Sequence, residues 1–289
     1  MFPILPVGAA ARHASDPHTV KLWQAMPGTH RGQTVSVSAQ LMGDLQTAQS
    51  VIDAVKQNLS HGAGNLKSDF MLSEGASYQR SVAARHLREV DFRGDDNGLA
   101  KSALAAQAGA CAEHCALTLA YLADMQLDRP IFTYAAANDA DHQINLIGDL
   151  REPRQAIVVD AWPSFAKAHL LDNAQFQPDP ARILAVHYPG MKARFGLDEM
   201  IEVAAVDEGR VAEINQLKGT PSYAQTLAAR PDIGLREQPH GLRNLGVRYQ
   251  NQDDFNQLFE NTVDRADYER QARGAQLAQR HLPQPPEEV

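Results

Sequence analysis

The sequence predicts an α+β fold, with helices toward both ends of the chain and a small antiparallel sheet between them. The prediction rests on two changes in the spacing of apolar residues along the sequence. Apolar residues first recur at helical spacing, and short stretches rich in β-branched and aromatic residues then follow between 129 and 188. Helical spacing returns from 197 onward. A chain of 289 residues can bury a core of its own, and no linker in it is long enough to force a domain boundary.

Three helices are expected before the strands, at 41–59, at 77–90 and in a third stretch that ends near Met125. The third begins at either Leu99 or Ala110, and only Gly109 favours a break between them. The choice matters because Cys111 lies in the first turn of a helix that begins at Ala110, but in the middle of one that begins at Leu99. Helices are also expected in "LDEMIEVAAV" (197–206), "SYAQTLAA" (222–229) and a long polar stretch near 252–280.

The strands are expected at 129–136, 141–149 and 155–162, and 183–188 is a candidate for a fourth. The turn-rich stretch "GDLREPR" (148–154) joins the second strand to the third, which predicts an antiparallel hairpin. With the turn centred near Arg151, His142 lies directly opposite Asp160. In such a pair the carboxylate selects the tautomer of the imidazole and stabilises its charged form.

The composition limits the class of partner. A net charge of −8 and a pI near 5.7 argue against a protein that binds nucleic acid or an anionic membrane, because both need positive potential. No apolar run approaches the length of a membrane span. The two cysteines cannot form a disulfide framework, so the thiols are expected to be reduced, in the cytosol of the producing cell or of a host.

Both ends of the chain are expected to be disordered. The segment 1–40 is rich in Ser, Thr, Gln, Gly and Pro, which would suit a leader for bacterial secretion and equally an ordinary flexible N-terminus. The tail 281–289 is rich in Pro and Glu. A single α+β domain is therefore expected over 41–280.

Cys111 is the strongest candidate for a catalytic residue. At a helix start it meets the positive end of the helix dipole, which favours a thiolate, and backbone N–H groups of the first turn can bind an oxyanion. With His142 and Asp160 it completes the three parts of a thiol enzyme. Cys115, one turn further on, is expected to belong to the core, and the two cysteines exchange roles if the helix begins later.

A zinc site is the alternative for this segment. Glu113 and His114 lie between the two thiols, but Cys-x-x-His-Cys on one helix cannot complete a tetrahedron without distant ligands. Neither a metal nor a cofactor is therefore expected.

"GACAEHC" (109–115) resembles the G-x-C-x-E-H motif around the nucleophile of many bacterial effector proteins, and "DHQINLIGD" (141–149) and "VVDAWP" (158–163) resemble their His and Asp strands. The family that these motifs resemble is the HopX (AvrPphE) group of type III effectors, in the transglutaminase-like and papain-like superfamily. The resemblance covers about 107–165. It implies a nucleophile helix packed on a small antiparallel sheet, and secretion by a bacterium for action in the host cytoplasm.

Carried over to this chain, the motifs imply that Cys111 is the nucleophile, His142 the base and Asp160 the orienting acid. The chain departs from the pattern at Ala110, where an Asn often stands. The side chain that would stabilise an oxyanion is thus unassigned, and three candidates are Gln79, Asn97 and Gln107.

These observations predict a thiol-dependent enzyme that acts on amide bonds of a host protein, as a cysteine protease or as a glutamine deamidase or transglutaminase-like enzyme. Which of these reactions it performs depends on the acceptor of the acyl group. The alternative is a non-enzymatic effector that keeps the scaffold and binds a host protein. The target protein and the oligomeric state are left open.

Overall fold

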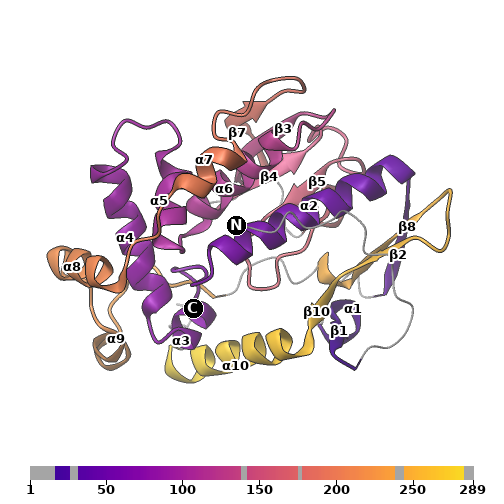
Figure 1. Cartoon of the computed structure of the whole chain (residues 1–289). Coiled ribbons are helices and arrows are strands. Elements are labelled where there is room, and N and C mark those ends of the chain that lie inside the picture. Colours follow the sequence, from indigo (N-terminus) through magenta and orange to yellow (C-terminus); the bar gives the residue numbers. More distant parts are fainter. Residues whose placement is uncertain (1–16, 27–31, 138–141, 175–177, 238–243, 283–289) are drawn as a thin grey trace.

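The structure, a computed structural model, describes residues 17–26, 32–137, 142–174, 178–237 and 244–282, and these form a mixed α and β fold (Figure 1). The predicted α+β class is confirmed. In the described residues the strands form sheets of two, three and five strands. No helix in these ranges has the length and the apolar content needed to cross a membrane.

The five-stranded sheet is antiparallel throughout and has the order β6-β5-β4-β3-β7. Its strands are β3 (Ile131–Ala136), β4 (Gln143–Ile147), β5 (Ile157–Val159), β6 (His169–Leu170) and β7 (Pro178–His187). The three expected strands and the candidate fourth are therefore confirmed. The two-residue strand β6 was not predicted, because so short a stretch shows no periodicity.

The register of the β4–β5 hairpin differs by two residues from the predicted one. Val159 pairs with Asn145, whereas a turn centred on Arg151 would pair it with Gln143. The turn is displaced because Gln155 N–H and Ala156 N–H both donate to Glu152 O, which makes the connection asymmetric. A shift of two residues leaves every side chain on its own face, since the side-chain period of a strand is two.

The helices before the sheet are α2 (Ala39–Asn58), α3 (Lys67–Leu72), α4 (Ala76–Val90), α5 (Gly98–Ala106) and α6 (Cys111–Asp124). Those expected at 41–59 and 77–90 are confirmed as α2 and α4. Helix α6 packs against β3 and β4, and α2 packs against α6 and β5 (Figure 1). The core between them includes Leu45, Ile52 and Leu117, all fully buried. Each such side chain contributes about 1.5–3 kcal/mol to the free energy of unfolding.

The third expected helix is broken in two, between α5 and α6. Gln107 ends α5 in the left-handed region, with φ 55°. Gly109 then pairs with Ala63 in a parallel bridge, and its carbonyl accepts a hydrogen bond from Gly64 N–H. The backbone of 107–110 thus bonds outside the helix, and Cys111 is the first residue of α6.

The C-terminal helices are α7 (Leu197–Glu202), α8 (Glu208–Lys218), α9 (Tyr223–Ala229) and α10 (Arg265–His281). The long helix expected near 252–280 begins only at Arg265. The chain before it forms β8 (Val247–Asn251), β9 (Leu258–Glu260) and β10 (Thr262–Asp264). The prediction of helix from 252 was wrong because β9 pairs with β8 in a hairpin, and because β8 and β10 also pair with strands from distant segments.

Two of those partners lie in the segment expected to be disordered. Strand β1 (Thr19–Lys21) pairs with β10, and β2 (Gln33–Val37) pairs in parallel with β8. A short helix, α1 (Leu22–Ala25), follows β1 and buries Leu22. The expected disorder is therefore wrong for these elements. Residues 1–16, 27–31 and 283–289 lie outside the described residues.

Candidate active site

The residues of the "GACAEHC" motif build the start of α6. Glu113 reaches back to accept a hydrogen bond from Ala110 N–H (2.8 Å), which caps the helix. Gly109 is required there, because a Cβ at this position would lie 2.3 Å from Glu113 Cβ. Cys111 is thereby held at the first helical position, where the positive end of the helix dipole lies.

His114 has a structural role in the same turn. Its Nδ1 lies 2.9 Å from Ala110 O, and since a carbonyl only accepts, Nδ1 must carry the proton. Burial, assisted by the charge of Lys56, lowers the pKa of His114 to about 3. His114 is therefore neutral at physiological pH, and its ring donates a hydrogen bond to the backbone at the start of α6.

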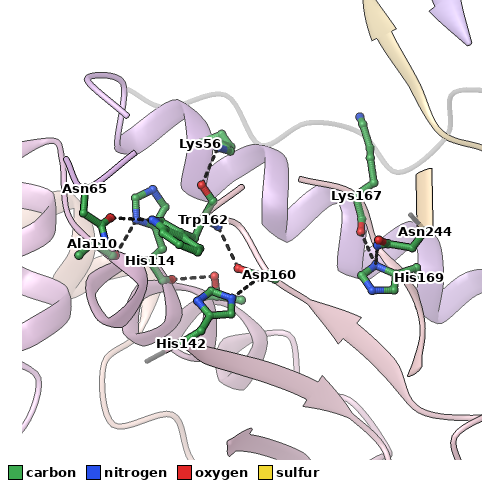
Figure 2. A network of polar contacts seen from close by, with 11 residues as sticks. Lys56, Asn65, Ala110, His114, His142, Asp160, Trp162, Lys167, His169 and Asn244 are labelled. Atoms are coloured by element: carbon green, nitrogen blue, oxygen red, sulfur yellow. Dashed lines mark hydrogen bonds and ion pairs between the residues drawn. The ribbon is translucent and has the colours of Figure 1, made fainter. Parts of the chain in front are cut away.

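His142 and Asp160 form a buried ion pair. Their Nε2 and Oδ2 atoms are 2.6 Å apart, and both side chains are buried (Figure 2). His142 lies immediately before β4 and Asp160 immediately after β5, beyond the paired residues. With the observed register they are diagonal neighbours, still within reach of each other.

The pKa values of the pair move apart. Burial alone would lower the pKa of His142, but the charge and hydrogen bond of Asp160, together with the Cys111 thiol, raise it to about 10. Burial alone would raise the pKa of Asp160, but the charge and hydrogen bond of His142 hold it below its usual range. The imidazole is therefore protonated at neutral pH.

Cys111 lies beside this pair, close enough to influence His142. A hydrogen bond and the charge interaction with the Cys111 thiol are among the causes that raise the pKa of His142. Because Nε2 faces Asp160, Nδ1 is the nitrogen that can exchange a proton with the sulfur. The structure therefore brings Cys111, His142 and Asp160 together from three separate elements.

Trp162 covers the pair. Its ring lies over the imidazole of His142, with the ring centroids 4.6 Å apart, and its backbone N–H donates to Asp160 Oδ1 (3.0 Å). Its indole Nε1–H donates to Asn65 Oδ1 (2.8 Å), and Lys56 Nζ approaches its carbonyl oxygen (3.5 Å) (Figure 2). Trp162 is 1% exposed. The indole thus excludes water from the ion pair, which strengthens it.

Cys115 has different surroundings. It is buried, and burial together with the charge of Asp160 raises its pKa well above the usual value. Thr133 and Asn145, on β3 and β4, make hydrogen bonds to its side chain that only partly offset this. A thiol in this environment stays protonated and is a poor nucleophile. The two cysteines are thus chemically distinct, with Cys111 beside the imidazole and Cys115 against the sheet.

Cys111 opens onto a cleft of about 730 Å³, although its own side chain is largely buried. Three arginines line this cleft, Arg85 and Arg88 on α4 and Arg236 from the segment after α9. The two carboxylates among its described lining residues are committed elsewhere, Glu113 to the helix cap and Glu89 to Lys218. The cleft is therefore positive although the chain is acidic overall.

The candidates for an oxyanion side chain lie elsewhere. Asn97 donates from Nδ2 to Arg194 O, and Gln107 ends α5 with its carbonyl bonded to His61 N–H. Gln79 is on α4, and its carbonyl accepts from Asn215. None of the three is among the described residues that line the cleft.

Asn65 and the three arginines were missed at the sequence level. They come from segments far from Cys111 in the chain, so no local spacing links them to it. Within the described part of the chain, no group of three or more His, Cys, Asp or Glu side chains is placed to hold a metal ion.

Comparison with known proteins adds no relative: no family model matches the chain, and no curated protein and no solved structure is significantly similar to it.

Proposed function

We propose that this chain is a thiol-dependent enzyme acting on amide bonds of a protein, with Cys111 as nucleophile, His142 as acid–base and Asp160 as orienting acid. One observation carries the proposal. A cysteine at a helix start lies beside an imidazole that is held by a buried carboxylate, at the edge of a cleft. This arrangement is that of an activated nucleophile.

The raised pKa of His142 makes the imidazole the proton carrier of the pair, so in the proposed step the Cys111 proton passes to it. The sulfur then attacks the carbonyl carbon of an amide, and a carbon–sulfur bond forms. The carbon–nitrogen bond breaks as His142 donates its proton to the leaving nitrogen. The resulting thioester is cleaved by water, which restores the thiol, or by an amine, which forms a new amide bond.

The proposed target is a folded protein of a host cell, recognised largely outside 107–165. The motifs that resemble those of type III effectors support delivery by a bacterium and action in the host cytoplasm, in a papain-like or transglutaminase-like core. Glutamine deamidation and limited proteolysis are the proposed outcomes, and transglutamination follows if an amine reaches the thioester before water does.

Selective alkylation tests the nucleophile. We expect iodoacetamide at neutral pH to modify Cys111 much faster than Cys115, because Cys111 lies at the cleft beside the His142 imidazolium while burial keeps Cys115 protonated. Peptide mass mapping after short exposure measures both, and Cys115→Ala serves as the matched control for Cys111→Ala. Equal modification of the two thiols would refute the assignment.

Mass spectrometry of host-cell proteins after expression of wild type and Cys111→Ala tests the reaction. A glutamine converted to glutamate indicates deamidation, a new terminus indicates proteolysis, and a cross-linked pair indicates transglutamination. Changes present with wild type and absent with Cys111→Ala are expected.

One observation favours the alternative, a non-enzymatic effector that binds a host protein. The edge strand β7 and the turn after it expose large apolar side chains, among them Ile183, Leu184, Tyr188 and Met191. If wild type and Cys111→Ala produce the same cellular effect and leave identical proteomes, this alternative is the function.

A further inference from the structure

Asn65 lines the same cleft as Cys111 and is held rigidly beside it. Its neighbours Ala63 and Leu66 pack in one apolar cluster with Cys111 and Trp162. The preceding residues pair with Gly109 through the parallel bridge described above. The carbonyl of Asn65 accepts a hydrogen bond from Arg236 N–H (2.7 Å). The backbone of Asn65 is therefore attached both to the start of α6 and to the far wall of the cleft.

The side-chain amide of Asn65 has a single orientation. An indole N–H can only donate, so the atom that faces Trp162 Nε1 at 2.8 Å must be the amide oxygen. The Nδ2 group therefore points away from the indole. Among the described residues Nδ2 has no acceptor, and Asn65 is only half-buried where it lines the cleft. Its hydrogens remain available to a molecule in the cleft.

We propose that Asn65 Nδ2 donates a hydrogen bond to the oxyanion that forms when Cys111 attacks a carbonyl, together with backbone N–H groups of the first turn of α6. This rests on the proposed function. As the carbon–sulfur bond forms, the electron pair of the carbonyl π bond moves to oxygen, and it returns when the leaving group departs. A donor fixed in advance stabilises that negative charge without reorganising. Asn65 supplies the side-chain donor that the motif lacks at Ala110.

Trp162 is the positioning residue for this donor. One indole ring covers the imidazole of His142 and also orients the amide of Asn65. The acid–base pair and the proposed oxyanion donor are thus both positioned by the same side chain, whose indole contacts His142 and Asn65 (Figure 2).

Two reagents separate this role from a structural one. Acylation by p-nitrophenyl acetate passes through an oxyanion, whereas alkylation by iodoacetamide displaces iodide from a saturated carbon and does not. We expect Asn65→Ala and Asn65→Asp to slow acylation of Cys111 by about 100-fold while alkylation stays close to the wild-type rate. Trp162→Phe, which keeps an aromatic ring but removes the indole N–H, is expected to slow acylation by a smaller factor. Asn97→Ala, outside the cleft, is the control and should change neither rate.

Equal losses in both reactions would overturn the proposal, because they would mean that Asn65 supports the thiol–imidazole pair or the fold. Unchanged acylation in Asn65→Ala would overturn it as well. Failure of the proposed function has a different signature: wild-type Cys111 would then be alkylated no faster than Cys115, or would not be acylated by the ester at all.

Discussion

Asp160 is the residue that contributes most to keeping His142 charged. The carboxylate faces Nε2, so Nδ1 is the nitrogen left for the proposed proton exchange with Cys111, and the charge of the carboxylate is the main reason that the pKa of His142 is raised in spite of burial. A neutral amide at 160 could donate to Nε2 and would then stabilise the opposite tautomer, with the proton held on Nδ1.

We therefore expect Asp160→Asn to leave the fold intact and to reduce the acylation rate of Cys111 by several powers of ten, on the order of 10³–10⁴. Circular dichroism checks the fold, and acylation by p-nitrophenyl acetate measures the rate. Asp149→Asn is the control, since its ion pair with Arg151 lies in the exposed part of the β4–β5 turn. A rate unchanged by Asp160→Asn would remove Asp160 from the proposed mechanism.

At the scale of elements, the break between α5 and α6 gives Cys111 its position. The break requires close approach of Gly109 to Glu113, whose carboxylate caps the new helix. Without it, an unbroken helix would place Cys111 where every backbone N–H is bonded within the helix.

Gly109→Ala is expected to lower the free energy of unfolding by about 1–3 kcal/mol, because the new Cβ would lie 2.3 Å from Glu113 Cβ and force the helix start to move. Urea denaturation measures the change. Gly43→Ala is the matched control: it lies in α2 with no atom near the added Cβ, and it should stabilise by about 0.5–1 kcal/mol. If Gly109→Ala is as stable as wild type, the close approach does not determine the break.

Helix α4 supplies two of the arginines that line the cleft. Arg85 and Arg88 are three residues apart, so they lie on the same side of the helix, and both line the cleft. These positive charges should therefore favour an anionic reagent over its neutral analogue at Cys111. A variant without the charges should show less of this preference.

We expect Arg85→Glu/Arg88→Glu to lower the ratio of the iodoacetate rate to the iodoacetamide rate at Cys111, and added salt to reduce the difference between wild type and variant. Alkylation followed by mass spectrometry gives both rates. Arg182→Glu on β7, outside the cleft, should leave the ratio unchanged. A ratio insensitive to the α4 charges would mean that the arginines do not act on molecules in the cleft.

At the scale of the whole molecule, the buried titratable groups shape the dependence of stability on pH. The pKa of His142 is raised to about 10 in the folded protein. The contribution of His142 to the free energy of unfolding is therefore complete below the ordinary pKa of 6.5, and it is lost as the pH rises to about 10. Asp160, with a lowered pKa, contributes above its ordinary 3.8 and loses this as the pH falls through the folded value. His114 acts in the opposite sense to His142, and stability falls from pH 6.5 toward 3 as the unfolded chain takes up its proton.

His142→Gln is therefore expected to flatten the decline of the unfolding free energy between pH 6.5 and about 10. Urea denaturation at intervals across this range measures it, with His187→Gln as the control because His187 is outside the buried pair. Parallel declines in wild type and His142→Gln would show that the ion pair does not govern the alkaline limb.

Much of the fold, and the proximity of His142 to Asp160, could be predicted from local pattern. Helical spacing found α2 and α4, β-branched runs found β3, β4 and β5, and turn residues placed His142 near Asp160 even with the register two residues off. That error was harmless because a shift of two preserves the face. The pairing of β1 with β10 and of β2 with β8 could not be predicted, because it joins segments more than 200 residues apart.

The sequence by itself determined which chemical groups are present and the local patterns that form their elements: a cysteine before an apolar helix, and a His and an Asp on consecutive strands. Only the tertiary structure decided where α6 begins, that Trp162 covers His142, and that Asn65 and the arginines of α4 meet Cys111 in one cleft. The physical reason is the distance along the chain over which each effect acts. Periodicity and turn chemistry act over a few residues, whereas burial, pKa shifts and the orientation of an amide depend on neighbours that the fold brings from distant parts of the chain.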